Sequence, residues 1–351
     1  MSTLVQITPA ISGQELQQHR IMQLPVLVLF PHNRCNCRCM MCDIWRIRET
    51  RQLWPSDLAP HMESIRALGV RWVVFSGGEP LLHEELSGLL SLFRAENIRT
   101  TLLSTGLLLK SCAQMVGSSV DDVIVSLDGP PAVHNTIRRV PDAYQRLAEG
   151  ISAVRRLHPQ IEIHARCTVQ KRNHDALEAT IEAAMVLGLN SISFLAADTT
   201  SSAFNRPDGW SDARKNSVQL NAEEIETLTV VIEKIIARYS GRFVREGPEK
   251  LRRIVEHFRA ALGQQEPVAP RCNAPWVSAI LEADGTVRPC FFHQAIGNLG
   301  EAPLERILNS KRALEFRASL QINENPTCRN CVCSLYYNEI DDNPMTKSET
   351  T

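Results

Sequence analysis

Apolar runs alternate with amphipathic stretches through most of the chain. Six runs rich in apolar residues have the character of buried strands, at residues 25–30, 71–76, 98–104, 122–127, 161–169 and 191–197. Stretches of helical character separate or follow them, at residues 57–68, 84–96, 143–157, 175–187, 222–239 and 247–263. This alternation predicts an α/β fold, with a parallel sheet inside and helices outside. Right-handed crossovers would curl the sheet into a full or partial barrel.

A different pattern begins near residues 264–275, where three prolines interrupt the chain. A β-hairpin with a glycine in its turn is predicted within residues 277–289, followed by a helix at 303–319. We therefore divide the chain into an N-terminal segment (1–24), a core (25–240), a helical linker (241–268), a small C-terminal α+β domain (269–335) and a polar tail (336–351). We expect the end of that tail, residues 338–351, to fray.

The composition is that of an ordinary globular protein. Of the 351 residues, 44% are hydrophobic and 22% charged, and the net charge is −1. This balance provides no global basic field, so we expect no nucleic-acid partner. No apolar run reaches the roughly 18 residues of a membrane span, so we expect no membrane partner. Residues 1–24 lack the layout of a signal peptide, and we expect a cytoplasmic protein.

Eleven cysteines change this ordinary picture, because seven of them fall into two tight clusters. An odd number of clustered cysteines without an export signal argues against a disulfide framework. In a reducing compartment, clustered thiolates usually hold metal. The sequence therefore indicates metal chemistry.

The first cluster contains Cys35, Cys39 and Cys42, spaced Cys-x3-Cys-x2-Cys just after the first predicted strand. Three thiolates on a short loop can hold three irons of a [4Fe–4S] cube and leave the fourth iron open to an external chelate. The alternative is zinc held by four cysteines, or by three cysteines and a histidine. Zinc sites more often pair two Cys-x2-Cys halves.

The second predicted strand ends in Ser76, Gly77, Gly78, Glu79 and Pro80. Together with the cysteine spacing, this segment resembles the signature motifs of the radical SAM superfamily. The resemblance implies a partial (β/α)6 TIM-like barrel whose open iron binds S-adenosylmethionine (SAM). It further implies reductive cleavage of SAM to a 5′-deoxyadenosyl radical, which abstracts hydrogen from a substrate.

The resemblance also implies which residues bind SAM. Gly77 and Gly78 lack Cβ atoms, so their backbone can approach a ligand closely. Glu79 is a plausible partner for the amino group of SAM. Met41 stands where the family usually has an aromatic residue, beside the adenine. Further cofactor contacts are expected from strand ends, at Ser76, Ser104, Ser126, Arg138 and Leu195.

Ser126 and Arg138 take their roles from relatives with an auxiliary cluster, in which the serine contacts SAM and the arginine binds its carboxylate. The alternatives are a serine hydroxyl satisfied by backbone and an arginine that is a solvated surface charge. Catalytic residues are not defined by the sequence. The candidates are Arg166 on the polar face of the fifth strand, Asp198 and Cys333. Asp198 begins a long loop, residues 198–221, which is either a substrate lid or a surface excursion.

The second cluster contains Cys272, Cys290, Cys328 and Cys331. Four thiolates complete a [4Fe–4S] cube without an obvious open iron. The pattern resembles the SPASM/Twitch auxiliary-cluster domain, and it departs from full SPASM because Tyr337 occupies an expected cysteine position. We therefore predict the Twitch form, with one auxiliary cluster, and keep a structural zinc ribbon as the alternative. Cys37 and Cys333 are hydrogen donors, alternative ligands or plain reduced thiols.

These inferences predict an oxidoreductase-type radical SAM enzyme. Its auxiliary cluster would accept an electron during dehydrogenation of a small polar metabolite, such as a sugar, an aminocyclitol or a nucleoside. The 24 residues before the first strand are too few for a leader-peptide recognition domain. Epimerisation, decarboxylation and modification of a peptide or protein are the alternatives. We expect two partners, the small-molecule substrate and a reductant such as flavodoxin or ferredoxin.

Two rival classes explain less of the sequence. A non-catalytic zinc or iron–sulfur binding module accounts for the cysteines but not for residues 76–80. A radical methylthiotransferase would usually carry an extra domain for RNA or a second substrate, and the chain has no room for one.

Overall fold

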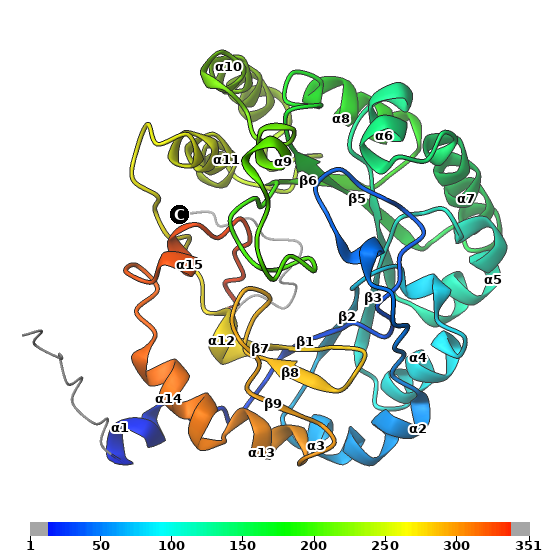
Figure 1. Cartoon of the computed structure of the whole chain (residues 1–351). Helices are drawn as coiled ribbons and strands as arrows, with labels where there is room; N and C mark the ends of the chain where they lie inside the picture. The colour runs from blue at the N-terminus through cyan, green and yellow to red at the C-terminus, as the bar shows by residue number, and fades with distance from the viewer. Residues whose placement is uncertain (1–12, 338–351) are drawn as a thin grey trace, which may run out of the picture.

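The computed structural model describes residues 13–337, so the tail predicted to fray lies outside the described residues. Nine strands form one sheet in the order β6-β5-β4-β3-β2-β1-β7-β8-β9. The first six strands pair in parallel, each with its neighbour in sequence. They are β1 (Val26–Leu29), β2 (Trp72–Phe75), β3 (Arg99–Ser104), β4 (Asp122–Ser126), β5 (Glu162–Val169) and β6 (Ser191–Ala196). Figure 1 shows them curled into a partial barrel, as the sequence predicts.

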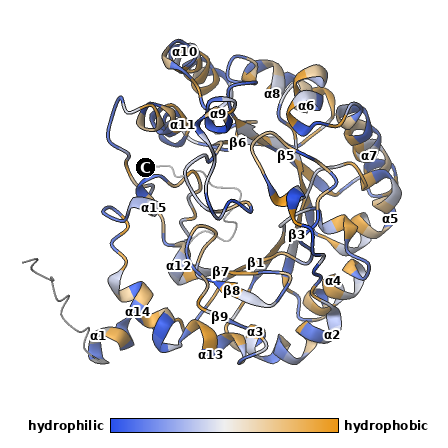
Figure 2. Cartoon of the chain, in the orientation of Figure 1, coloured by the Kyte–Doolittle hydropathy of each residue, from blue (hydrophilic) through white to orange (hydrophobic). Residues whose placement is uncertain are grey.

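Helices cover the outside of this barrel. They include α3 (Met62–Ala67), α4 (Leu86–Ala95), α5 (Leu109–Ser119), α6 (Pro131–Arg138), α7 (Ala143–Leu157), α8 (Leu177–Val186), α10 (Ala222–Tyr239) and α11 (Pro248–Ala261). Individual helices carry both apolar and polar residues, as Figure 2 shows. Their apolar faces pack on the sheet in one large core. The sequence pattern does not predict α5 and α6.

Two stretches predicted as single helices are interrupted. Residues 57–68 contain the end of α2 (Pro55–Leu58), a 3₁₀ turn (Ala59–His61) and α3, because Pro60 lacks the N–H that a continuous helix needs. Residues 303–319 contain α13 (Leu304–Leu308) and α14 (Lys311–Ser319). Ser310 separates these two helices, since its side chain accepts a hydrogen bond from the Ala313 N–H and caps α14.

The C-terminal hairpin extends the barrel sheet. β7 (Ser278–Leu281) pairs antiparallel with β8 (Thr286–Arg288), which pairs with β9 (Gly297–Asn298). Gly285 in the connecting turn has a φ of +80°, which glycine adopts without strain. β7 also runs parallel to β1 in the register Val26↔Ser278 to Leu29↔Leu281. The hairpin therefore covers the edge of β1 that would otherwise present unpaired backbone groups.

The remaining elements are short and lie in connections. They are α1 (Gly13–Gln18), η1 (Ile44–Arg46), η3 (Pro80–Leu82), α9 (Asp212–Asn216), α12 (Ala274–Val277) and α15 (Pro326–Arg329). Figure 1 shows α12 and α15 beside the open side of the barrel, on the side where α11 lies. Within residues 13–337, no helix has the length and apolar character needed to cross a membrane.

Candidate active site

The two cysteine clusters face the same cavity. This cavity has a volume of about 530 Å³ and lies inside the barrel, where strand side chains and the loops at the carboxyl ends of the strands line it. Its wall contains all seven predicted metal ligands, namely Cys35, Cys39, Cys42, Cys272, Cys290, Cys328 and Cys331. All seven are free thiols. The fold thus brings together two groups that lie more than 200 residues apart in sequence.

The first cysteine loop is held by its own backbone and by the end of α6. The Cys42 N–H donates to the Cys39 carbonyl at 3.4 Å, and the Met40 N–H donates to the Ile137 carbonyl at 3.0 Å. A hydrogen bond from Cys37 and the nearby Arg138 lower the pKa of Cys39 to about 7, against the effect of burial. Burial raises the pKa of Cys42 to about 12. Only the thiolate ligates metal, so Cys42 needs a bound cation to ionise at neutral pH.

This donor set fits an iron–sulfur cube. Three thiolates on one loop leave one iron without a protein ligand, as SAM chelation requires. No three His, Cys, Asp or Glu side chains within residues 13–337 are spaced as the ligands of a single metal ion. The fit therefore rests on the number and kind of donors and on the loop that carries them.

Arg138 is the buried cation of the site. It is 7% exposed, which rules out the interpretation of a solvated surface charge. Its Nη2 lies 2.6 Å from the Asp128 carboxylate, and its Nη1 donates to Cys39 Sγ at 3.6 Å. Burial acts to lower the pKa of Arg138, but Asp128 and the cysteine thiolates raise it overall, so the guanidinium stays charged. Its Nε has no hydrogen-bond partner among the described residues. Arg138 lines the cavity, and a guanidinium in that wall suits a carboxylate ligand.

Glu79 lies beneath the cavity wall. Its side chain is fully buried and accepts hydrogen bonds from Ser104 Oγ (3.0 Å), from Thr105 Oγ1 (2.6 Å) and from the backbone N–H of Thr105 (2.7 Å). Burial raises the pKa of this carboxyl, and the Thr105 hydrogen bonds oppose the rise. In this arrangement Glu79 fixes the end of β3. Its contact with the amino group of SAM remains a prediction.

Gly77 and Gly78, the two glycines before Glu79, allow two segments of the chain to approach each other closely. The sequence predicts a close approach to a ligand instead. A Cβ on Gly78 would lie 1.9 Å from the carbonyl oxygen of Arg34, which belongs to the cysteine loop. Gly77 has a φ of +103°, and a Cβ there would lie 2.9 Å from Phe30 Cβ. Both residues also line the cavity. The glycines thus let the end of β2 pack against the cysteine loop. Their contact with a ligand remains a prediction.

The other predicted cofactor contacts lie in the cavity wall, at Met41, Ser76, Ser104, Ser126 and Leu195. Leu195 and its neighbour Phe194 point to opposite sides of β6, and Phe194 is buried in the core. On β5, Cys167 is likewise buried in the core, while Arg166 and Thr168 line the cavity. The alternation of side chains along the strand explains this division.

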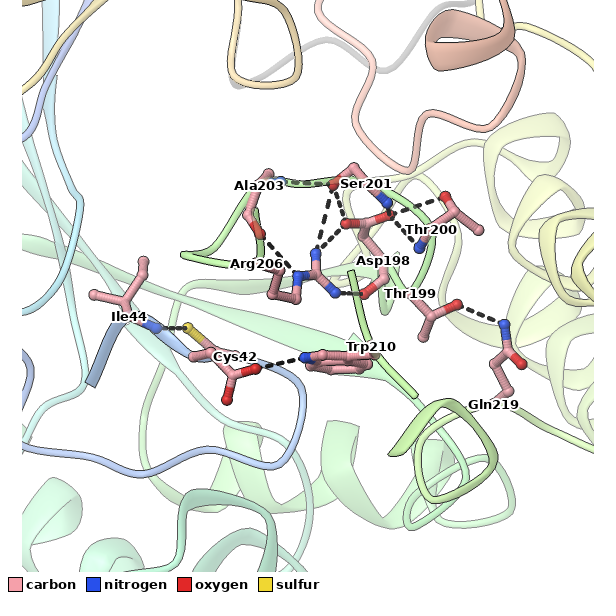
Figure 3. Close-up of polar contacts among 11 residues, drawn as sticks. Cys42, Ile44, Asp198, Thr199, Thr200, Ser201, Ala203, Arg206, Trp210 and Gln219 are labelled. Carbon is pink, nitrogen blue, oxygen red and sulfur yellow. Dashed lines mark hydrogen bonds and ion pairs between the residues drawn. The ribbon is translucent and has the colours of Figure 1, made fainter. Parts of the chain in front are cut away.

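The three candidate catalytic residues differ in what their side chains contact. Arg166 and Cys333 line the cavity, and burial raises the pKa of the Cys333 thiol. Asp198 lines the cavity too, but its carboxylate forms a buried ion pair with Arg206 and accepts hydrogen bonds from Ser201 and Thr200 (Figure 3). Asp198 therefore organises the start of loop 198–221 in this structure.

The second cysteine group has neighbours that the sequence motifs do not predict. His293 Nε2 lies 3.3 Å from Cys328 Sγ, and the Ala274 N–H lies 3.4 Å from Cys272 Sγ. Burial raises the pKa of Cys290 to about 12 and that of Cys328 to about 11. His293 follows Cys290 by three residues, a spacing that could have identified it.

Lys250 of α11 was also missed, although it lines the cavity together with Arg166. It belongs to no motif, and only the packing of α11 beside β6 places it there.

Family models match two parts of the chain. Residues 29–184 match the radical SAM superfamily, and residues 272–332 match SPASM, described as an iron–sulfur cluster-binding domain. The chain therefore contains a radical SAM domain and a SPASM-type domain. Its cofactors are SAM, the SAM-binding [4Fe–4S] cluster and an auxiliary cluster. The narrower division into the Twitch form remains a prediction.

Curated relatives share the core with this chain. It is 28% identical over 162 residues to the AdoMet-dependent heme synthase of Methanosarcina barkeri, covering 44% of this chain and 45% of the relative. It is 30% identical over 174 residues to GTP 3′,8-cyclase 2 of Pseudomonas aeruginosa, covering 46% of this chain and 51% of the relative. The chain thus spans about half the length of these relatives.

Solved structures share the fold. Streptococcus suis SuiB bound to S-adenosylmethionine aligns with a TM-score of 0.65 and 15% identity, covering 96% of this chain and 79% of SuiB. anSMEcpe with bound AdoMet and the Cp18Cys peptide aligns with a TM-score of 0.63 and 17% identity, covering 87% of each chain. At these identities the likeness shows the fold alone.

Proposed function

We propose that this radical SAM enzyme oxidises a small polar metabolite, such as a sugar, an aminocyclitol or a nucleoside, by dehydrogenation. The observation that carries the proposal is that both cysteine clusters line one cavity. A substrate in this cavity lies between the site that removes its hydrogen and a site that can take up its electron.

The electron balance follows from this arrangement. Cys35, Cys39 and Cys42 would hold the cluster that, with SAM, would supply a 5′-deoxyadenosyl radical, and one hydrogen atom from a substrate carbon would convert that radical to 5′-deoxyadenosine. The substrate then loses a proton from its hydroxyl or amino group to a base and one electron toward the second cysteine group. The substrate is thereby oxidised by two electrons, and its C–O or C–N bond becomes a double bond. Arg138 and Ser126 would hold SAM during this sequence, with Leu195 and Met41 against its adenine.

Two cationic side chains favour a polar substrate. Arg166 donates from Nε to Ser193 Oγ at 3.3 Å, which holds its guanidinium in the cavity wall. Lys250 approaches the same cavity from α11. Both can donate hydrogen bonds to hydroxyl, carbonyl or phosphate oxygens of a substrate. An external one-electron reductant such as flavodoxin or ferredoxin completes the requirements of the reaction.

Epimerisation is the second candidate, and one observation favours it. Cys333 lines the cavity, and its free thiol carries a hydrogen atom that could return to a substrate radical. In that case the substrate is not oxidised, and the thiol must be restored by an electron and a proton. Decarboxylation and peptide modification use the same first step.

The test is a substrate screen with deuterium-labelled sugars, aminocyclitols and nucleosides. The proposed dehydrogenation predicts transfer of one deuterium into 5′-deoxyadenosine and a product two mass units lighter than the unlabelled substrate. An epimerase would instead yield a product of unchanged oxidation state that contains solvent hydrogen. Absence of deuterium transfer from every class, with transfer from a peptide, would contradict the small-molecule proposal.

A further inference from the structure

A second hollow also borders the first cysteine loop. It has a volume of about 530 Å³ and is lined by residues 34–36, Arg38, Trp45, Ile47, Arg48 and Thr50. We call it the basic hollow. Cys35 lines both the basic hollow and the substrate cavity. A molecule in the basic hollow can therefore approach this metal ligand without entering the substrate cavity.

The charge of this surface is unbalanced. Residues 34–51 contain five arginines and two acidic residues, in a chain whose net charge is −1. Both acidic residues are already engaged, since Asp43 pairs with Arg46 at 3.0 Å and Glu49 with Arg51 at 3.0 Å. The three arginines that line the hollow are exposed, and none has a carboxylate partner among the described residues. They are Arg34, Arg38 and Arg48.

The position of these arginines relates the charge to the metal site. Arg34 directly precedes Cys35, and Arg38 directly precedes Cys39. Trp45 also lines the hollow, with the Arg38 guanidinium 5.9 Å from the centre of its ring and its Nε1 donating to the Cys42 carbonyl at 2.9 Å. An aromatic residue surrounded by arginines is typical of protein-binding surfaces.

We propose that the basic hollow is the docking surface for a small acidic electron-transfer protein that reduces the cluster beside Cys35. One electron passes per docking event, so the partner is oxidised by one electron and the cluster is reduced by one. Complementary charge accelerates and orients such an encounter and makes it sensitive to salt. The inference rests on the proposed function only in that the cluster must receive an electron before each cleavage of SAM.

The test compares the triple variant Arg34→Glu/Arg38→Glu/Arg48→Glu with a matched control, Arg20→Glu/Arg156→Glu/Arg312→Glu. The control changes three exposed arginines by the same total charge at distant positions. The first readout is direct binding of purified flavodoxin, measured by calorimetry at low and at physiological salt. We expect the hollow variant to weaken binding at least about tenfold and to lose most of its salt dependence, whereas the control retains both.

The second readout separates docking from damage to the cluster loop. Cleavage of SAM is measured with reduced flavodoxin and, in parallel, with dithionite, which needs no docking surface. The hollow variant should lose flavodoxin-driven cleavage and keep dithionite-driven cleavage. Wild-type binding and wild-type flavodoxin-driven cleavage in this variant would overturn the proposal, and so would equal losses in the hollow and control variants. If the wild-type protein fails to cleave SAM even with dithionite, the proposed function fails, while the binding measurement still decides the docking surface.

Discussion

The indole Nε1 of Trp210 donates a hydrogen bond to the carboxylate of Asp43, the residue that directly follows Cys42. Loop 198–221 is thereby tied to the first cysteine loop (Figure 3). The guanidinium groups of Arg206 and Arg214 lie 4.6 and 4.9 Å from the centre of the Trp210 ring, and Arg206 in turn pairs with Asp198. The loop is therefore part of the wall around the metal site, and a surface excursion does not describe it.

Replacement of Trp210 by phenylalanine should loosen this connection. Phenylalanine keeps an aromatic ring beside the two arginines but removes the N–H that the buried Asp43 carboxylate accepts. We expect the free energy of unfolding to fall by about 1–2 kcal/mol, and we expect reconstituted iron to be lost faster. Urea unfolding and timed iron release measure the two effects. Trp54→Phe is the control, and equal effects in both variants would contradict the role of the Asp43 contact.

The Asp128–Arg138 pair makes a prediction about SAM binding. Arg138→Ala leaves the buried Asp128 without its cation, so the free energy of unfolding should fall by about 3–5 kcal/mol. Adding Asp128→Ala should restore part of that stability, since the unpaired charge is removed. SAM binding, measured by equilibrium dialysis, should remain weak in both variants. Recovery of SAM affinity in the double variant would show that Arg138 does not hold the cofactor.

The two cysteine groups should be separable by mutation. Cys39→Ala removes a ligand of the first cluster and should abolish SAM cleavage. Cys290→Ala should lower the iron content by up to about four atoms per chain while some uncoupled cleavage of SAM persists. Cys112→Ala, in α5, is the matched control. Iron and sulfide analysis after anaerobic reconstitution gives the readout, and full SAM cleavage by Cys39→Ala would refute the assignment of the first cluster.

His257 in α11 predicts a pH dependence of stability. Burial lowers the pKa of His257 to about 4, although Asp198 and the Ala197 backbone oppose this effect. In this pH range His257 binds a proton in the unfolded chain but stays neutral in the folded chain. The free energy of unfolding therefore decreases as the pH falls from about 6.5 to about 4. The full difference amounts to about 3 kcal/mol. Urea unfolding of wild-type protein and His257→Gln between pH 7 and 4.5 measures it, and a gap between the two that stays constant with pH would contradict the prediction.

Local sequence patterns predict much of this molecule because the relevant interactions are local. Parallel strands covered on both faces are nearly continuous apolar runs, so β1 to β6 are recognisable one by one. The spacing of Cys35, Cys39 and Cys42 predicts that one short loop carries all three. The alternation of side chains along β5 predicts that Arg166 and Cys167 lie on opposite faces of the strand.

Other features depend on contacts between distant segments. Nothing near Glu79 in sequence indicates that Ser104, at the end of β3, and the adjacent Thr105 donate hydrogen bonds to its carboxylate. From the sequence, Asp198 is expected to be an unpaired carboxylate just after a strand. In the structure it forms an ion pair with Arg206. Lys250 enters the cavity only because α11 packs beside β6.

The parallel pairing of β1 with β7 has a consequence for electron movement. The first cysteine loop begins at the end of β1, and Cys272 lies just before β7. Backbone hydrogen bonds in register thus connect β1 and β7, the strands next in sequence to these two metal-binding segments, where a flexible linker between domains would have allowed a hinge. For the proposed dehydrogenation, we therefore expect the rate of electron transfer to the second cysteine group to be independent of domain motion.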